Sequence, residues 1–187
     1  MNKYKIIAII GKAGSGKDTI LKKLTNSNLA FHEIVSCTTR PPREGEVNGD
    51  NYYFISPEEF GCKILANEML EAAVFNDWCY GTSFDSLRIN DINIGVFNPT
   101  GIETMNSLKN VDLTVYYVRA SDKTRLKRQL DREENPDIDE IIRRYHTDKE
   151  DFYDLDFDYI ELINEKPGDI DVCVRTIMDN LTTTNCI

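Results

Sequence analysis

A glycine-rich segment near the start of the chain has the residue types and spacing of a phosphate-binding loop. It reads Gly11-Lys12-Ala13-Gly14-Ser15-Gly16-Lys17, follows the apolar run Ile6–Ile10 and precedes a helical pattern. Its glycines let the backbone turn N–H groups inward around a phosphate, the helix N-terminus adds a favourable field, and Lys17 adds a point charge. The alternative is a glycine-rich turn between strand and helix that binds nothing. The order of strand, loop, lysine and helix favours a phosphate site.

Asp18 departs from the usual form of this motif, in which a serine or threonine hydroxyl ligates Mg²⁺. Thr19 follows at once but points to another side of the helix. Because a carboxylate is a good Mg²⁺ ligand, we predict that Asp18 is the metal-binding residue, although it brings a negative charge close to the phosphates. The residues predicted to hold the phosphates and the metal are Gly11, Ala13, Gly14, Ser15, Gly16, Lys17, Asp18 and Thr19.

A second polar segment, Ser36–Phe54, carries two arginines that can act together. Pro41 and Pro42 stiffen the backbone between Arg40 and Arg43, so that both guanidinium groups can converge on one phosphate. Tyr52, later in the segment, can add a hydroxyl donor. The alternative is a polar surface loop with two exposed arginines.

Alternating strands and helices must position these segments. The 187 residues, 41% of them hydrophobic, are typical of one folded domain rather than a disordered chain. Short β-like runs alternate with helical patterns, which predicts an α/β fold with a parallel sheet flanked by helices. The predicted strands are Tyr4–Ile10, Glu33–Ser36, Ile92–Phe97, Leu113–Val118 and Tyr159–Ile163. The predicted helices are Asp18–Thr25, Gly101–Leu108, Asp122–Asp131 and a closing helix after Pro167.

Two stretches interrupt this alternation. Residues 36–91 are too long for a single crossover and are predicted to form an inserted subdomain. Residues 132–150 are highly charged, with a thin apolar stripe, and are predicted to form a mobile helical lid; the alternative is a solvated surface helix. The remaining residues, 1–35, 92–131 and 151–187, would form the core of one domain spanning 1–187.

Charge, hydropathy and cysteine content exclude several classes of function. A net charge of −10 argues against a general nucleic-acid-binding surface. The run Ile6–Ile10 is far shorter than the roughly 20 apolar residues that cross a bilayer, and no secretory signal precedes it. The five cysteines are scattered and odd in number, which argues against a disulfide framework or a zinc site. We therefore expect a cytoplasmic protein with no nucleic-acid or membrane partner.

The segment Ser36–Phe54 resembles the signature of the guanylate kinase family, S-x-T-T-R-x-P-R-x-G-E-x-x-G-x-x-Y-x-F, at every specified position. The resemblance extends over nearly the whole chain and includes Met69-Leu70-Glu71 and Tyr80-Gly81-Thr82-Ser83. It implies a P-loop NTPase fold with a nucleoside-monophosphate-binding insert and a lid. The implied reaction is Mg²⁺-dependent phosphoryl transfer from ATP to GMP or dGMP. By this resemblance Arg40, Arg43, Tyr52 and Tyr80 would hold the GMP phosphate, and Ser36, Glu71 and Thr82 would bind guanine.

The chemistry of guanine supports the assignment of Glu71. Guanine offers N1–H and N2–H₂ as adjacent donors that one carboxylate can accept together, whereas adenine presents an acceptor at N1. A site built on such hydrogen bonds can reject the wrong base by roughly 10⁴-fold or more. Taken without the neighbouring motifs, Glu71 would be read as an ordinary exposed glutamate.

The chain departs from the family pattern in two places. Asn98 stands where the family has an aspartate that contacts the base and the water around the metal. Relative to the family, the chain therefore gains a carboxylate at Asp18 and loses one at Asn98. The lid arginines fit the family spacing only if one residue is inserted, and each of them can instead pair with a local carboxylate. Arginines there would neutralise the transferred phosphoryl group, worth ~10³–10⁵ in rate. The catalytic residues implied are Lys17, Arg40, Arg128, Arg132 and Arg144, with Asn98 beside the base.

Other functions remain open at this point. The acceptor could be another deoxynucleoside monophosphate or ribose 1,5-bisphosphate, although the guanine-binding residues argue against the latter. A non-catalytic guanylate-kinase-like binding module is a different class, disfavoured by the intact Gly11, Gly16 and Lys17. The Gly-Lys-Asp-Thr variant resembles phage-encoded nucleotide kinases, which would act in a host cytoplasm. The sequence is compatible with a monomer or a homodimer.

Overall fold

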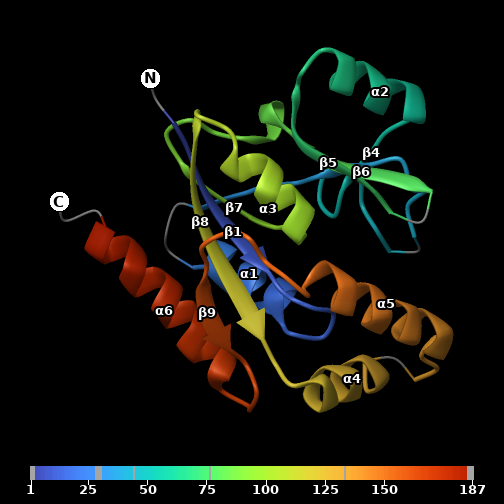
Figure 1. The fold of residues 1–187 in the computed structure, drawn as a ribbon, viewed down its shortest axis with the longest axis vertical. Helices are drawn as coiled ribbons and strands as arrows, with labels where there is room; N and C mark the ends of the chain where they lie inside the picture. The colour runs from blue at the N-terminus through green and yellow to red at the C-terminus, as the bar shows by residue number, and fades with distance from the viewer. Residues whose placement is uncertain (1–2, 28–30, 44, 76, 133, 185–187) are drawn as a thin grey trace. The chain divides into compact units, whose positions relative to one another are not determined.

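The computed structural model describes residues 3–27, 31–43, 45–75, 77–132 and 134–184 (Figure 1). The strands are β1 Tyr4–Ile10, β2 Phe31–Glu33, β3 Cys37–Thr38, β4 Tyr53–Phe54, β5 Met69–Phe75, β6 Trp78–Ser83, β7 Ile92–Val96, β8 Val111–Arg119 and β9 Ile160–Ile163. The helices are α1 Lys17–Thr25, α2 Pro57–Leu65, α3 Pro99–Asn106, α4 Asp122–Leu130, α5 Ile138–Asp151 and α6 Asp169–Thr184, with a 3₁₀ turn at Phe84–Ser86.

The strands form two sheets. The larger is a parallel sheet of order β2-β7-β1-β8-β9 flanked by helices, and the smaller has the order β4-β3-β6-β5. In β1 every residue from Ile6 to Ile10 is buried, as expected for a central strand covered on both faces. The predicted α/β fold with a parallel sheet is therefore confirmed.

One predicted strand is divided between the two sheets. Within the predicted segment Glu33–Ser36, β2 pairs with β7 only as far as Glu33, and Ile34 N–H then donates to Ile94 O at 2.8 Å. The Ser36 carbonyl instead accepts from Tyr53 N–H at 2.9 Å, at the start of the smaller sheet. The apolar pattern is continuous across this point, so it does not reveal where the chain changes sheets.

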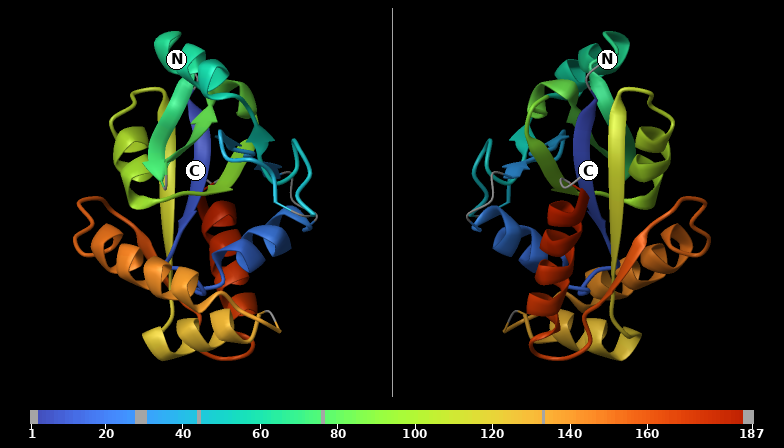
Figure 2. Two further views of the ribbon diagram at one scale, coloured as in Figure 1. Left: turned by 90° about the vertical axis from the view of Figure 1, so that its right-hand side faces the viewer. Right: turned by 90° about the vertical axis from the view of Figure 1, so that its left-hand side faces the viewer.

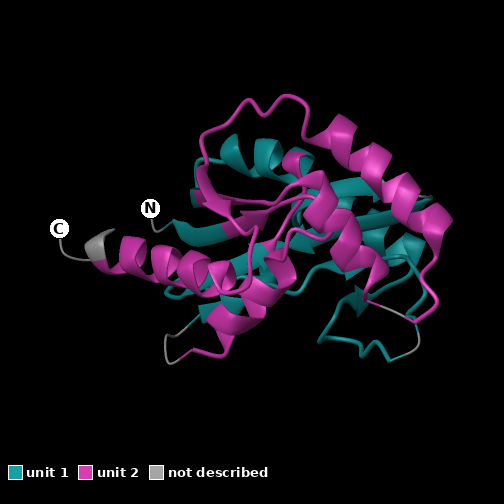
Figure 3. Ribbon diagram, turned by 90° about the horizontal axis from the view of Figure 1, so that it is seen from below, with its two compact units in different colours: residues 1–7, 30–95, 100–113 teal, residues 8–29, 96–99, 114–187 magenta. Residues whose placement is uncertain are grey.

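The chain divides into two compact units (Figure 3). Unit 1, residues 1–7, 30–95 and 100–113, contains the smaller sheet and α2. The α2 helix begins with Pro57 after an N-cap at Ser56, whose hydroxyl accepts from Glu59 N–H, and it buries Phe60.

Unit 2, residues 8–29, 96–99 and 114–187, contains the glycine-rich loop and the helices that support it. Figure 2 shows α6 beside α1 and α4 beside α5, and both pairs are in contact. The lid predicted for 132–150 contains α5, which the Asp137 side chain caps by accepting from Glu140 N–H. Within the described ranges, no helix is both long enough and apolar enough to span a membrane.

Candidate active site

The glycine-rich loop joins β1 to α1 and leaves a helix N-terminus open. Gly16 is the N-cap residue of α1, with a φ of 97°, and no side chain caps the first turn of that helix. The amide groups at the start of a helix have no partner within the helix, so they can bind an anion. Gly14 also has a positive φ, 78°, which lets the loop turn tightly before the helix. The loop therefore has the geometry that phosphate binding requires.

Side chains from other elements bind the loop through its carbonyl oxygens. Arg125 Nη1 donates to Ala13 O at 2.9 Å, and Asn164 Nδ2 donates to Ser15 O at 2.7 Å. Arg128 Nη1 lies 3.4 Å from Gly14 O. Side-chain donors from other elements thus contact three successive carbonyl groups of the loop.

Lys17 and Asp18 open α1 side by side. The Lys17 ammonium lies 3.8 Å from the Asp18 carboxylate, whose side chain is 74% exposed. Mg²⁺ bound with nucleotides takes one or two protein carboxylates and fills its remaining positions with phosphate oxygens and water. The described residues contain no cluster of three or more potential metal ligands. The exposed Asp18 side chain supplies one carboxylate, which is within the number that a nucleotide-bound Mg²⁺ uses.

The three arginines expected to cover the transferred phosphoryl group have different surroundings. Arg128 Nη1 donates to Asn164 O at 3.1 Å and so lies on the carbonyl side of the loop. Arg144 Nε donates to Glu140 at 2.7 Å within α5, where the guanidinium groups of Arg143 and Arg144 lower the pKa of Glu140 to about 2. Arg132 is exposed just beyond α4. The three side chains thus have separate partners or surroundings.

Arg40, expected to hold the acceptor phosphate, is nearly buried in unit 1. Its Nη2 donates to Glu46 Oε1 at 2.8 Å, and its guanidinium carbon lies 5.7 Å from the centre of the Tyr52 ring. The other Glu46 oxygen accepts from Arg43 N–H at 2.7 Å. The hydrogen bond to Glu46 is the main cause that raises the pKa of Arg40, with the Tyr80 hydroxyl contributing less.

The other three residues expected to hold the acceptor phosphate differ in their surroundings: Tyr52 and Tyr80 lie beside Arg40, and Arg43 is exposed. Tyr52 and Tyr80 meet edge to face, with ring centres 6.0 Å apart, beside Arg40. Arg43 is exposed, and its bond to Glu46 uses the backbone rather than the guanidinium group. A planar cation held by one carboxylate next to two phenol groups can still offer donors to a phosphate.

The three residues expected to bind guanine lie together. The hydroxyl groups of Ser36 and Thr82 are 3.0 Å apart, and Glu71 pairs with Thr82 across β5 and β6. Glu71 is only 8% exposed. Burial raises the pKa of its carboxyl group, and hydrogen bonds from Thr82 oppose that rise. A nearly buried carboxylate beside two hydroxyl groups can accept hydrogen bonds from the N–H groups of a base and so distinguish one base from another.

A β-bulge sets the direction of Glu71. Met69 pairs with Ser83 while Glu71 pairs with the preceding residue of β6, Thr82, so Leu70 is an extra residue in β5. Gly81 permits the close approach of the two strands, because a Cβ atom there would lie 2.6 Å from Glu71 O. Bulges of this kind commonly re-aim a side chain next to a site.

Asn98, the last candidate, lies at the carboxyl end of a strand. It follows β7 after Phe97, precedes α3 and is exposed. It belongs to unit 2, whereas the three guanine-binding candidates belong to unit 1.

Four residues in these arrangements were not assigned roles from the sequence: Glu46, Arg125, Asp148 and Asn164. Glu46 is part of the matched signature, which was a signal that it has a role. Asp148 Oδ2 accepts from Ala13 N–H at 2.8 Å although 135 positions separate the two residues, and no local pattern indicates such a contact. Asn164 follows β9 without a motif around it.

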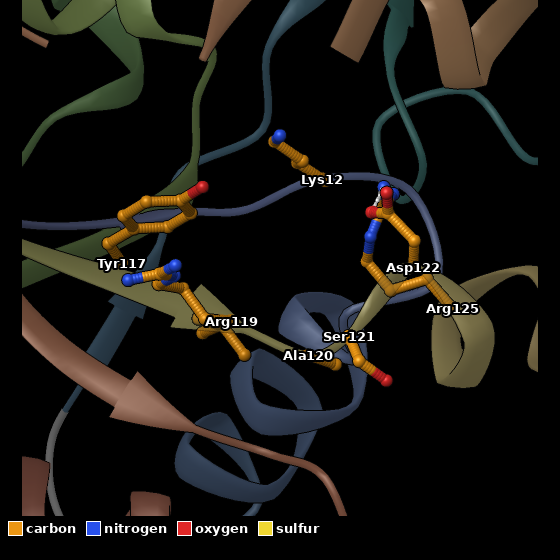
Figure 4. A pocket seen from close by; sticks show the side chains of 8 residues that line it. Lys12, Tyr117, Arg119, Ala120, Ser121, Asp122 and Arg125 are labelled. Carbon is orange, nitrogen blue, oxygen red and sulfur yellow. Dashed lines mark hydrogen bonds and ion pairs between the residues drawn. The ribbon is translucent and has the colours of Figure 1, made fainter. Parts of the chain in front are cut away.

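A small cavity of about 190 Å³ lies at the carboxyl end of β8 (Figure 4). Figure 4 shows Lys12, Tyr117, Arg119 and Arg125 around it. Burial and the nearby Arg125 lower the pKa of Lys12. The cavity therefore adjoins the loop and is lined by several cations.

Comparisons with known proteins point to one family. The family model described as guanylate kinase matches residues 3–180. A guanylate kinase of Mesoplasma florum is 51% identical over 82 residues, 43% of this chain and 28% of that protein. One of Protochlamydia amoebophila is 29% identical over 179 residues, 94% of this chain and 90% of that protein. The matches to the first three curated relatives each cover less than half of the relative's length.

A solved structure shares the fold. The crystal structure of guanylate kinase from Anaplasma phagocytophilum superposes with a TM-score of 0.71 at 18% identity, covering 98% of this chain and 87% of that one. At this identity the likeness concerns the fold alone, while the family model carries the assignment across the chain. The chain belongs to the guanylate kinase family.

Proposed function

We propose that this protein transfers the γ-phosphoryl group of ATP to GMP or dGMP. The observation that carries the proposal is the nearly buried Glu71 carboxylate beside the Ser36 and Thr82 hydroxyl groups. Glu71 would accept both N1–H and N2–H of guanine, and the hydroxyl groups would meet its remaining polar atoms. Such a site discriminates by leaving polar groups unpaired when the wrong base is bound.

The chemistry needs positioning and charge neutralisation more than covalent help. A phosphate oxygen of GMP would attack the γ-phosphorus, the bond to the β–γ bridging oxygen would break, and ADP would leave with that electron pair. The loop amides and Lys17 would hold the donor phosphates, and Arg40 with Tyr52 and Tyr80 would hold the acceptor phosphate. Bound Mg²⁺ would neutralise charge on the donor phosphates, with Asp18 as its protein ligand.

We further propose different roles for the arginines of α4, α5 and the segment between them. Arg128 would position the loop, because it donates to Asn164 O. Arg132 and Arg144 would cover the transferred group, with Arg144 exchanging Glu140 for phosphate oxygens when substrates bind. The family's nucleotide substrates and the free state of Cys37, Cys62, Cys79 and Cys173 support a cytoplasmic place of action.

The test is ADP production from ATP and Mg²⁺ with GMP, dGMP, AMP, dTMP and ribose 1,5-bisphosphate offered singly. Turnover confined to GMP and dGMP would support the proposal. Turnover with another acceptor would mean that this chain has a different specificity. Direct binding of ATP without turnover of any acceptor would favour a non-catalytic binding module.

Replacing Asp18 with serine is expected to raise the Mg²⁺ concentration for half-maximal activity by ~10-fold, equivalent to ~1.4 kcal/mol. The physical reason is the loss of a charged ligand that the exposed Asp18 side chain can supply. The measurement is an Mg²⁺ titration at saturating ATP, with calorimetry of ATP binding at several Mg²⁺ concentrations. Asp112→Ser, at an exposed position of β8, is the control. An unchanged titration for Asp18→Ser would remove Asp18 from the metal site.

A further inference from the structure

Arg125 is a cation in a position that is normally apolar. Among the described residues it is the one that α4 buries, with 1% of its surface exposed. Burying a charged side chain costs free energy unless hydrogen bonds and opposite charges compensate it. The groups that pair with Arg125 therefore indicate the role of this buried side chain.

Those partners are the loop and two carboxylates. Arg125 Nη1 donates to Ala13 O at 2.9 Å and to Asp148 Oδ2 at 3.0 Å, and Nη2 donates to Asp122 Oδ1 at 2.8 Å. The same Asp148 oxygen accepts from Ala13 N–H at 2.8 Å. Both backbone polar groups of Ala13 are thus held by side chains, one from α4 and one from α5.

The backbone of Arg125 also fits closely against the loop. A Cβ atom on Gly14 would lie 2.5 Å from Arg125 O, so the positive φ of Gly14 and the position of α4 depend on each other. Side chain and backbone of one residue therefore fix two successive residues of the loop.

The α5 helix contacts this arrangement through its second half. Tyr145 donates to Asp122 Oδ2 at 2.7 Å, and Phe152, at the end of α5, stacks on Tyr117 with ring centres 5.2 Å apart. In the first half, Ile138 and Ile142 are 47% and 50% exposed. The contacts of Asp148, Tyr145 and Phe152 thus anchor α5 at the end that touches the loop.

We propose that Arg125 and Asp148 are positioning residues of the ATP site, which couple the docking of α5 to the shape of the phosphate loop. The pair is called the loop clamp below. When α5 is docked, the loop clamp fixes the peptide groups on both sides of Ala13. The amides of Gly16 and Lys17, at the start of α1, then face the donor phosphates in one arrangement. This inference rests on the proposed function, because it takes ATP as the ligand of the loop.

The loop clamp predicts a selective loss of ATP affinity. Arg125→Met keeps much of the side-chain volume but removes the charge and the hydrogen bonds. We expect the Kd and KM for ATP to rise ~10- to 100-fold, the range for groups that orient a site without touching its ligand. The Kd for GMP should stay within about twofold, because Arg125 bonds to Ala13, Asp122 and Asp148, which belong to unit 2, whereas the residues expected to bind GMP belong mainly to unit 1. Arg125→Lys, which can keep one of the contacts, should recover part of the loss.

Asp148→Asn provides an independent variant. Its amide oxygen can still accept from Ala13 N–H, but its charge no longer balances Arg125. We expect a smaller loss of ATP affinity than for Arg125→Met. The fold-loss of ATP affinity in the double variant should be smaller than the product of the fold-losses in the two single variants, because both substitutions act through one contact. Arg175→Met is the matched control, since Arg175 is an exposed α6 residue whose Nε donates to the Asp171 backbone within its own helix.

Hydrogen exchange separates this inference from the proposed function. Without any nucleotide, the Ala13 amide should exchange at least ~10-fold faster in Arg125→Met than in the wild type or in Arg175→Met, and Asp148→Asn should show a smaller increase in the same direction. This result would support the loop clamp even if GMP proved not to be the acceptor. Unchanged Ala13 exchange and an unchanged Kd for ATP in a folded Arg125→Met protein would overturn it. An equal loss of ATP and GMP binding would also overturn it, since that pattern reports general destabilisation. If Arg125→Met does not fold, Asp148→Asn is measured against the same criteria.

Discussion

Glu71→Gln is expected to lower kcat/KM for GMP by roughly 10³-fold or more, with little change in the KM for ATP. The amide that replaces one carboxylate oxygen would present a donor to the N1–H or N2–H₂ group of guanine. Two donors would then face each other in a site that is only 8% exposed at Glu71. Steady-state kinetics with each substrate varied in turn provide the measurement. A loss of less than tenfold would show that guanine is bound elsewhere.

The same substitution should stabilise the folded protein at neutral pH. Burial raises the pKa of Glu71 above its ordinary value of 4.5, so folding favours the neutral carboxyl group and the associated stability is lost as pH rises through the raised pKa. A glutamine side chain does not ionise, so the Glu71→Gln protein has no such loss of stability as pH rises. The free energy of unfolding of Glu71→Gln should therefore exceed that of the wild type at pH 7, and the difference should shrink toward pH 4.

Urea unfolding at several pH values tests this expectation. Glu103→Gln, at an exposed position of α3, is the control and should show no comparable pH-dependent gain. A Glu71→Gln protein that is less stable than the wild type at pH 7 would contradict it. Higher stability together with lost GMP turnover would identify Glu71 as a residue retained for binding at the expense of stability.

Gly14→Ala is expected to abolish measurable ATP turnover and to destabilise the protein. The φ of 78° at Gly14 alone costs a residue with a side chain about 1–3 kcal/mol. The new Cβ would also lie 2.5 Å from Arg125 O, a backbone atom that cannot move aside without α4. Calorimetry of ATP binding and thermal unfolding provide the two measurements.

Gly61→Ala is the matched control for Gly14→Ala. Gly61 lies within α2, and a Cβ atom there would meet nothing within 4 Å. Alanine in a helix interior is favoured over glycine by roughly 0.5–1 kcal/mol, so this variant should be more stable than the wild type and fully active. The same chemical change should thus have opposite signs at the two positions. A Gly14→Ala protein with normal ATP affinity would show that the loop can adopt another shape.

Local patterns predicted the parts of the fold that depend on neighbouring residues. The loop from Gly11 to Lys17, the run of buried residues in β1 and the first residues of α1 and α4 all lie where the sequence placed them to within a residue or so. Their geometry is set by glycine conformations and apolar spacing, both of which can be read along a short segment. The meeting of Ser36, Glu71 and Thr82 was implied by the family resemblance instead.

Long-range contacts could not be predicted in the same way. Arg125 lies in a charge-rich, mostly basic segment, where a cation is normally a surface residue, yet it is buried and has partners 112 and 23 positions away. The family resemblance implied that Arg128 lies near the transferred group, and no local pattern indicated that its Nη1 would donate to Asn164 O. Spacing along a helix gives the face on which a side chain lies, and tertiary packing decides what that face meets.

The bulge in β5 affects which changes of strand length the proposed guanine site can tolerate. Leu70 is the extra residue, and the pairs on either side of it, Met69 with Ser83 and Glu71 with Thr82, are adjacent along β6. Deleting Leu70 would therefore leave Glu71 opposite Thr82 in a regular ladder, and its effect would be on the local bend of the strand rather than on its register. A one-codon deletion at this point would alter the aim of the proposed base-binding carboxylate without moving it to the other face of the sheet, whereas a point substitution at position 71 would change its chemistry directly. At the bulge, the site is thus more sensitive to the identity of its residues than to their number.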